Sequence, residues 1–349
     1  MDTSMDKMQR KLYIKLYDRM IKDLVNEIID ENIILDPDYQ RNYVWNNSKA
    51  SLLIESVLLN IPIPVIYASE DLNGKWIIVD GLQRLYSLQR YFNDDFKLVG
   101  LETLPELNGL KFSKLDESIQ KRLERGELRL IVLQNDSDPN IQFDIFMRLN
   151  TGAVKLNEQE LRNCLYRGAL NSLIKQIVKD NKAVAKMIPS KTDRMLANEL
   201  ILRYLAVSEH YNKIENKIKN YDGRIKNLIN GYMKEHQNDP EDMLKIIREK
   251  FEMQIEKAYR VLGANGFKKN IKTTKPNASL YECIMIGFED YALNDLLDKK
   301  DSIKAMIDKL LNDQEFLRSI DKATGNTEVM NSRIARFITE LKEVMLNAI

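Results

Sequence analysis

Residues 76–92 read WIIVDGLQRLYSLQRYF and decide the fold of the first part of the chain. Ile77, Ile78 and Val79 form a short β-prone run of the kind found in buried strands. The apolar residues after Gly81 recur instead at intervals of three and four, as on one face of a helix. The segment therefore predicts a strand, a tight turn at Asp80 and Gly81, and a helix.

The first turn of this helix is a candidate anion site. Gln83 and Arg84 fall where free backbone N–H groups meet the positive end of the helix dipole. An arginine there can bind a phosphate through two parallel hydrogen bonds, and Asp80 could cap the helix, hold a metal ion or bind a ribose hydroxyl. Taken alone, the segment is more typical of an ordinary Asp-Gly turn with a surface arginine.

Two further blocks of sequence favour a functional site at this turn over an ordinary Asp-Gly turn. The first, residues 36–45, places a glutamine and an arginine among large aromatic residues after a helix-breaking proline: Tyr39, Gln40, Arg41, Tyr43 and Trp45. The second, residues 143–152, ends a predicted helix on polar residues and a glycine: Arg148, Asn150 and Gly152.

In this order the three blocks resemble domain-of-unknown-function family 262, the GmrS-type N-terminal family. Its pattern is roughly Tyr-Gln-Arg-x-Tyr-x-Trp, then Asp-Gly-Gln-Gln-Arg, then Phe-x-x-x-Asn. The similarity is dense from about residue 15 to 210 and thinner beyond. Leu82 departs from the pattern, because the family most often has Gln there; we expect a change in packing that leaves the contacts of Gln83 and Arg84 intact.

The resemblance implies a ParB/sulfiredoxin-like domain that binds, and in several relatives hydrolyses, a nucleoside triphosphate. Arg84 and the N–H groups of residues 81–83 would hold the phosphates, and Asp80 or Asn150 would position a Mg²⁺ ion or a water. The implied catalytic residues are Asp80, Gln83, Arg84 and Asn150. The implied nucleotide-binding residues are Tyr39, Gln40, Arg41, Trp45, Gly81 and Arg148. Hydrolysis needs an in-line water and charge stabilisation, so this set suffices without a histidine.

The histidines and cysteines exclude several enzyme classes. Larger relatives usually carry a separate His-Asn-His nuclease domain, but this chain has two histidines, His210 and His236, in Lys- and Glu-rich sequence. Neither has the neighbours of a nuclease centre, and we interpret both as solvated surface residues. Cys164 and Cys283 lack zinc or redox spacing, which indicates two buried thiols in a reducing compartment.

The charge balance limits any DNA surface to local clusters. The net charge is +1 with 30% charged residues, and residues 259–279 contain no acidic residue. Around Phe267 this stretch carries the candidate DNA contacts Lys268, Lys269, Lys272 and Lys275. A solvated basic loop is the favoured alternative. The charged N-terminus and the absence of a long apolar run predict a cytoplasmic protein with no membrane partner.

The order of predicted elements gives the fold class, α+β. We expect a helix over 7–32, a helix capped by Asn47 or Ser48 that runs to residue 60, a hairpin of 63–69 with 76–79, a helix over 116–125 and a strand over 128–133. A capping box at Asn157 and Glu160 starts another helix. The later helices are predicted at 169–181, 193–212, 214–236, 240–262, 277–298, 301–312 and 330–347. A ParB/sulfiredoxin-like domain with a small mixed sheet would span 1–168, and a large all-helical domain 169–349.

Three functions are weighed. The leading one is a nucleoside-triphosphate-binding and NTP-hydrolysing regulatory protein of a DNA restriction or anti-phage defence system. Its partners would be a nucleoside triphosphate with Mg²⁺, DNA and a separate nuclease or effector protein; homo-oligomer formation is left open. The second is a ParB-like DNA-binding module that nucleotide switches. The third, a metal-dependent DNA nuclease, is least favoured because the motif blocks lack clustered carboxylate pairs.

Overall fold

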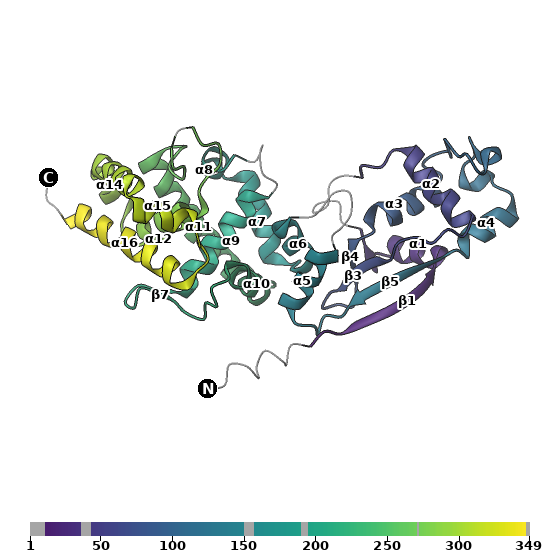
Figure 1. Ribbon diagram of the computed structural model, residues 1–349, viewed down its shortest axis with the longest axis horizontal. Coiled ribbons are helices and arrows are strands. Elements are labelled where there is room, and N and C mark those ends of the chain that lie inside the picture. Colours follow the sequence, from purple (N-terminus) through teal and green to yellow (C-terminus); the bar gives the residue numbers. More distant parts are fainter. Residues whose placement is uncertain (1–10, 36–42, 150–156, 190–194, 271, 347–349) are drawn as a thin grey trace. The chain divides into compact units, whose positions relative to one another are not determined.

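The computed structural model describes residues 11–35, 43–149, 157–189, 195–270 and 272–346 (Figure 1). The chain divides between Leu165 and Tyr166 into two compact units, called here the N-terminal unit and the C-terminal unit. No described helix is both long enough and apolar enough to cross a bilayer.

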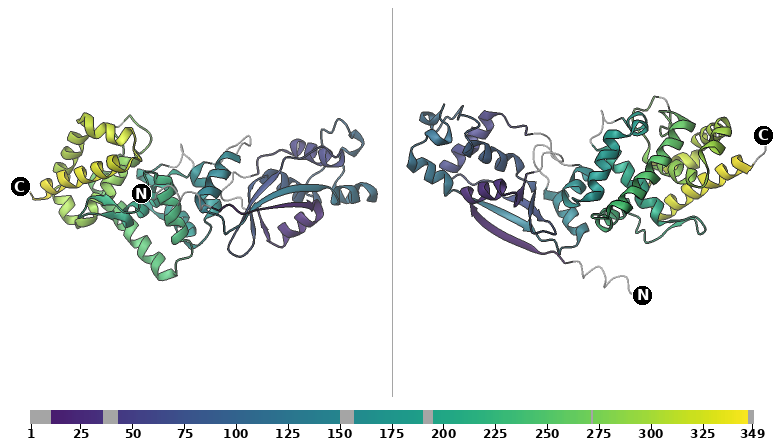
Figure 2. Two further views of the ribbon diagram at one scale, coloured as in Figure 1. Left: turned by 60° about the horizontal axis from the view of Figure 1, so that its bottom comes forward. Right: turned by 180° about the vertical axis from the view of Figure 1, so that it is seen from behind.

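The N-terminal unit is built on a five-stranded mixed sheet. Its strands are β1 (Ile14–Met20), β2 (Ile33–Ile34), β3 (Ile66–Glu70), β4 (Trp76–Asp80) and β5 (Glu127–Leu133), in the order β1-β5-β3-β4-β2. β1 pairs with β5, and β3 with β4, in antiparallel fashion, whereas β3 with β5 and β2 with β4 run parallel. β1 and β5 are the two long strands seen side by side in Figure 2. The expected α+β class with a small mixed sheet is confirmed.

The predicted hairpin of β3 and β4 is present, and an aspartate shapes its turn. One oxygen of the Asp71 carboxylate accepts hydrogen bonds of 2.8 Å from the backbone N–H groups of both Asn73 and Lys75. Gly74 adopts a φ of +79°, which side-chain-bearing residues rarely take. Local turn chemistry therefore fixes the start of β4 at Trp76.

Helices cover both faces of the sheet. One core packs α1 (Ile21–Ile29), α2 (Asn47–Leu58), α3 (Leu82–Phe92) and α4 (Glu117–Glu124), with short 3-10 turns at Pro105–Leu107 and Phe112–Lys114, around Ile78 of β4. A second core joins Val79 of the same strand to α5 (Pro139–Leu149) and α6 (Glu158–Leu165). Because successive residues of a strand face opposite sides, β4 contributes to both cores.

Local capping signals are mostly confirmed. Asn157 and Glu160 form the predicted capping box, since each side chain accepts a 2.8 Å hydrogen bond from the other's backbone N–H. The cap of α2 is Asn46, whose side chain accepts from the Lys49 N–H at 2.9 Å. We expected Asn47 or Ser48 in that place, so the start of α2 was one or two residues off.

The predicted helix over 7–32 is wrong in its first part. Ile14, Tyr17, Ile21 and Leu24 recur at helical spacing, but β1 occupies residues 14–20 and α1 starts only at Ile21. All seven β1 residues pair with β5, more than 100 positions away. Pairing with a distant strand thus overrides the local pattern, and most side chains of this edge strand are exposed.

The C-terminal unit is almost entirely helical. Its helices are α7 (Ala169–Asp180), α8 (Lys182–Met187), α9 (Leu196–His210), α10 (Ile225–Glu235), α11 (Glu241–Leu262), α12 (Ala278–Gly287), α13 (Leu293–Asp298), α14 (Lys300–Asn312), α15 (Gln314–Asp321) and α16 (Thr327–Leu346), with a 3-10 turn at Phe288–Asp290. α8 and α15 were not expected. The 3-10 turn divides the helix predicted over 277–298.

The helix predicted over 214–236 begins instead with a small hairpin. Strands β6 (Tyr211–Asn212) and β7 (Lys217–Ile218) pair before α10 starts. Asn216 and Asn220 have φ values of +52° and +55°, and the Asn212 side chain accepts hydrogen bonds from the N–H groups of Ile214 and Glu215. These asparagine turns stop the helix from beginning earlier.

A buried ion network joins three helices of this unit. Glu282 of α12 is fully buried, and Arg203 of α9 donates to its Oε1. Arg333 of α16 donates to Oε2 at 2.5 Å and to the carbonyl of Thr324 at 2.7 Å. Since each charge has a partner, the network can remain ionised inside the unit.

We predict that Glu282→Ala lowers the free energy of unfolding by about 3–5 kcal/mol, because it removes the carboxylate that both buried guanidinium groups share and leaves only Glu199, 3.9 Å from Arg203, nearby. Denaturant unfolding measures this difference. Glu315→Ala is the control, because that side chain is 93% exposed and lies 3.7 Å from Arg336; its effect should stay within about 0.5 kcal/mol. Equal effects of the two substitutions would contradict a structural role of the network.

Candidate functional site

The predicted strand, turn and helix over 76–92 are present, and Gly81 makes the turn. β4 ends at Asp80, α3 begins at Leu82, and Gly81 between them has a φ of +103°. A Cβ atom at Gly81 would lie 2.9 Å from Cγ1 of Ile66 and 3.3 Å from Nη2 of Arg84. Both the backbone conformation and the close approach therefore require glycine.

Arg84 joins three parts of the chain at this turn. Its Nη2 donates to Oδ2 of Asp80 at 2.7 Å and to the carbonyl of Val65 at 3.5 Å, and its Nη1 donates to the carbonyl of Pro64. Its side chain is 12% exposed and that of Asp80 29%. The sequence interpretation had Asp80 as a candidate helix cap, but the cap position belongs to Gly81 and Asp80 binds Arg84 instead.

Burial disfavours the charged form of both members of this ion pair. Burial raises the pKa of Asp80, and this effect outweighs the lowering caused by the charge and hydrogen bond of Arg84. Burial likewise lowers the pKa of the Arg84 guanidinium against the opposing effect of Asp80. A cation near Asp80 and an anion near Arg84 would therefore stabilise the charged forms of both groups.

Gln83 attaches part of the aromatic block to α3. Its Oε1 accepts hydrogen bonds from the backbone N–H groups of Val44 at 3.0 Å and Trp45 at 3.3 Å. The Tyr43 hydroxyl lies 2.9 Å from Oγ of Ser87, one turn further along the helix. The structure thus brings residues 43–45 together with the Asp-Gly turn.

The structure describes some of the other residues expected at the nucleotide site and not others. Val79, which precedes Asp80, packs with Phe143 and Phe146 of α5. Arg148 is exposed in the last turn of that helix. Tyr39, Gln40, Arg41 and Asn150 lie outside the described residues.

The arrangement can bind an anion together with a cation. The Arg84 N–H is bonded to the carbonyl of Gly81 at 3.0 Å, so the first-turn N–H groups of Leu82 and Gln83 are those suited to an anion. Arg84 reaches Oδ2 of Asp80, and the other carboxylate oxygen can serve a Mg²⁺ ion. Mg²⁺ commonly uses one or two carboxylates together with substrate phosphates and water, which a single aspartate fits.

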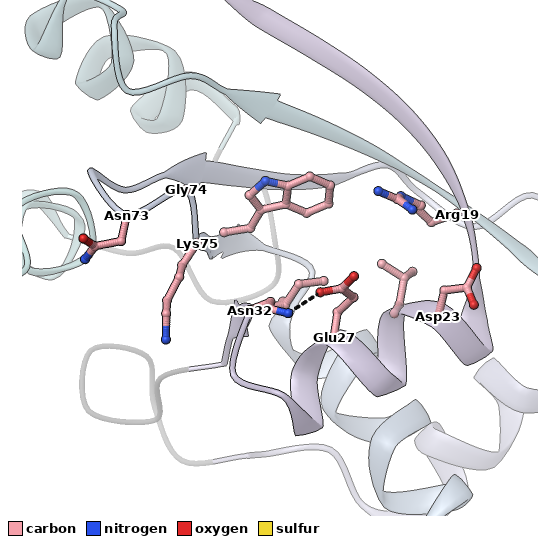
Figure 3. A pocket seen from close by; sticks show the side chains of 10 residues that line it. Arg19, Asp23, Glu27, Asn32, Asn73, Gly74 and Lys75 are labelled. Atoms are coloured by element: carbon pink, nitrogen blue, oxygen red, sulfur yellow. Dashed lines mark hydrogen bonds between the residues drawn. The ribbon is translucent and has the colours of Figure 1, made fainter.

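A separate cavity of about 270 Å³ lies at the other end of β4 (Figure 3). Trp76, the first residue of that strand, forms part of its wall, and the Tyr17 ring packs 4.7 Å from the Trp76 ring. On α1, Glu27 accepts a 2.8 Å hydrogen bond from Asn32. None of these residues was predicted to belong to a functional site, and they lie away from the Asp-Gly turn.

Neighbouring side chains bind two of the four expected DNA-binding lysines. Lys269 binds both carboxylate oxygens of Asp321, at 2.8 and 2.9 Å, and Lys268 binds Asn265. Both border a hollow of about 220 Å³. Lys272 and Lys275 are exposed. Phe267 is fully buried against Tyr281, so it cannot stack on a base.

The interpretation of both histidines as solvated is wrong for His236. Its side chain is 13% exposed and contacts Asp239 and Glu209. Burial alone would lower the pKa of His236, but its hydrogen bonds to these two carboxylates raise it. Asp239 follows three residues later in the sequence, whereas Glu209 comes from another helix and gave no local signal. Cys164 and Cys283 are buried free thiols, as expected.

Residues 21–167 match the family model described as GmrSD restriction endonuclease, N-terminal domain. No curated protein and no solved structure matches the chain. The matched range contains the Asp-Gly turn, residues 43–45 and α5.

We predict that Gly81→Ala destabilises the protein more than Gly74→Ala. Both glycines have positive φ, but a Cβ at Gly74 meets no atom within 4 Å. Gly74→Ala thus reports backbone strain of roughly 1–2 kcal/mol, and Gly81→Ala should add about 1–3 kcal/mol from overpacking against Ile66. Denaturant unfolding compares the two. Equal losses would mean that the contact with Ile66 relaxes and does not constrain the turn.

Proposed function

We propose that the N-terminal unit binds a nucleoside triphosphate with Mg²⁺ at the turn between β4 and α3. The protein hydrolyses this nucleotide to regulate a DNA restriction or anti-phage defence system, in which a partner chain supplies the nuclease. The observation that carries this function is the half-buried Asp80–Arg84 pair between the end of β4 and the start of α3, inside the range that matches a restriction endonuclease N-terminal domain.

Nucleotide binding would exchange the partners of this ion pair. A phosphate that approaches the first turn of α3 competes with Asp80 for the Arg84 guanidinium, because charge-assisted bonds to phosphate are strong. The released carboxylate then faces the Mg²⁺ ion that accompanies the phosphates. Burial already works against both charges in the pair. The exchange therefore supplies each group with a better counter-charge.

The same exchange provides a route from nucleotide to regulation. Arg84 holds the carbonyls of Pro64 and Val65, which precede β3, and Gln83 holds the backbone at residues 44 and 45. A guanidinium that turns toward phosphate loosens its hold on the first segment. The segments on both sides of α2 can therefore respond to the state of the nucleotide.

Hydrolysis would use the polar groups near the phosphates. Phosphoryl transfer depends on positioning and charge stabilisation, which Arg84, Gln83 and Asp80 can supply. We propose that Asn150 and Arg148 complete the set from the end of α5, with Tyr39, Gln40, Arg41 and Trp45 closing over the nucleotide. Exposed Lys272 and Lys275 are the lysines we propose for DNA contact.

We predict that Arg84→Ala weakens binding of a non-hydrolysable nucleoside triphosphate at least about tenfold, since a charge-assisted bond contributes roughly 1.5–3 kcal/mol. Titration calorimetry measures the affinity, and circular dichroism verifies the fold. Arg125→Ala, at an exposed arginine that ends α4, is the matched control and should bind as the wild type does. Unchanged affinity in Arg84→Ala would remove the phosphate site from this turn.

Phosphate release distinguishes the proposed hydrolysis from a nucleotide-switched DNA-binding module. Purified protein incubated with each of the four nucleoside triphosphates and Mg²⁺ should release phosphate in multiple turnovers, with and without DNA present. Tight binding without release would favour the module that uses nucleotide only as a switch.

We also predict that this chain alone does not cleave DNA in multiple turnovers with Mg²⁺ or Mn²⁺. One of its two histidines is held between carboxylates, and the Asp-Gly turn offers a single carboxylate whose partner is Arg84. Cleavage of plasmid DNA by nuclease-free preparations tests this. Turnover that disappears in Asp80→Asn would establish the metal-dependent nuclease instead.

A further inference from the structure

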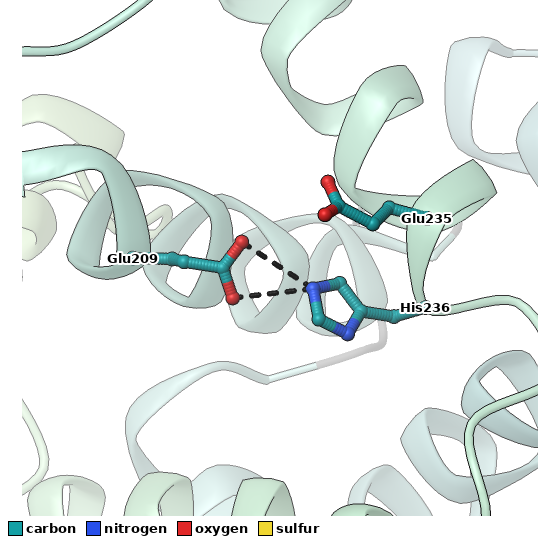
Figure 4. Close-up of side chains that lie close together, drawn as sticks. All are labelled: Glu209, Glu235 and His236. Atoms are coloured by element: carbon teal, nitrogen blue, oxygen red, sulfur yellow. Dashed lines mark hydrogen bonds and ion pairs between the residues drawn. The ribbon is translucent and has the colours of Figure 1, made fainter.

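Two helices of the C-terminal unit end at a common group of metal-ligating side chains. Glu209 lies in the last turn of α9, Glu235 is the last residue of α10, and His236 follows it (Figure 4). One ligand atom from each of these three side chains lies within 4.8 Å of the others. Figure 4 shows Glu209 and Glu235 approaching the imidazole from different helices.

The imidazole is held in one orientation. Its Nδ1 lies 2.7 Å from Oδ2 of Asp239, and its ring centre lies 4.3 Å from that of Tyr232. The other nitrogen, Nε2, faces Glu209, with 3.1 Å to Oε2 and 3.3 Å to Oε1. A carboxylate that binds one ring nitrogen while the other faces ligand oxygens is the usual outer contact of a metal-binding histidine.

The surroundings carry more negative than positive charge. Three carboxylates surround one imidazole, so a protonated ring balances only one of them. The C-terminal ends of α9 and α10 also lie here, and each adds the negative end of a helix dipole. A divalent cation would balance this field.

We propose that Glu209, Glu235 and His236 bind a divalent transition-metal ion, with Zn²⁺ as its chemical probe. An imidazole nitrogen with two carboxylates is a ligand set that suits Zn²⁺ or Mn²⁺ better than Ca²⁺ or Mg²⁺, which prefer oxygen ligands alone. Asp239 is a positioning residue, because it holds Nδ1 and directs Nε2 toward the ion. The site does not depend on the proposed nucleotide site.

The separations of the ligand atoms fit such an ion after a small movement of the Glu235 side chain. Zn–N and Zn–O bonds of about 2.0–2.2 Å place neighbouring ligand atoms roughly 3–3.5 Å apart in tetrahedral geometry. Nε2 and Glu209 already have this separation. Glu235 is exposed, so its side chain can turn toward the ion at little cost. The bound ion would link the ends of α9 and α10 within the C-terminal unit.

Calorimetric titration of the chelator-treated 349-residue chain with ZnCl₂ tests this site. We expect one Zn²⁺ per chain, with much weaker binding of Mg²⁺, and a rise in the unfolding temperature with Zn²⁺ concentration by mass action. Asp239→Asn should weaken the affinity about 10–100-fold, and His236→Gln should weaken it more. X-ray absorption of the zinc-loaded protein should show nitrogen and oxygen ligands.

The second histidine provides the matched control. His210 neighbours Glu209, and its Nδ1 lies 3.0 Å from the carbonyl of Ala206 in its own helix. His210→Gln should bind Zn²⁺ as the wild type does. If His236→Gln fails to fold, the exposed Glu235→Gln replaces it and should also bind Zn²⁺ more weakly. The absence of stoichiometric Zn²⁺ binding, or wild-type affinity in either His236→Gln or Glu235→Gln, would overturn the assignment.

Discussion

The Arg84 guanidinium is the contact on which the N-terminal unit's candidate site depends. It binds Asp80 at the end of β4 and the carbonyls of Pro64 and Val65 before β3, while its own backbone belongs to α3. A guanidinium that is 12% exposed must have such partners, because an unpaired buried charge is costly. Gly81 makes the contact geometrically feasible, since a Cβ there would press on both Ile66 and Arg84. Any ligand that binds the Arg84 guanidinium in place of these partners therefore affects the end of β4, the residues before β3 and the start of α3 together.

Three charged clusters differ in how far they are buried. In the C-terminal unit, Glu282 and two arginines form a buried network in which Arg203 also lies 3.9 Å from Glu199, and we interpret it as purely structural. The Asp80–Arg84 pair is partly exposed, and burial opposes both of its charges. The carboxylates around His236 exceed the positive charge that one imidazole can offer. Partial exposure to solvent is what distinguishes these two candidate sites from the buried network.

Features set by neighbouring residues could be predicted from the sequence, and features set by distant pairing could not. The turn at Asp80 and Gly81, the hairpin at Gly74 and the capping box at Asn157 depend on a few adjacent residues. β1 was missed because its partner is β5, more than 100 positions away. Arg84 was predicted in the first turn of the helix, but its bonds to the carbonyls of Pro64 and Val65 come from another segment. The contact of His236 with Glu209 likewise joins two helices. Tyr39, Gln40, Arg41 and Asn150 lie outside the described residues, and their roles stay predictions.

Hydrogen exchange with and without a saturating non-hydrolysable nucleoside triphosphate and Mg²⁺ tests the central claim most directly. Phosphates bound at the start of α3 would accept hydrogen bonds from the backbone N–H groups of Leu82 and Gln83. The account predicts slower exchange at these two residues and a change at residues 44 and 45, which Gln83 holds. Unchanged exchange at residues 82–83 while the nucleotide is bound, with protection only elsewhere in the chain, would contradict it.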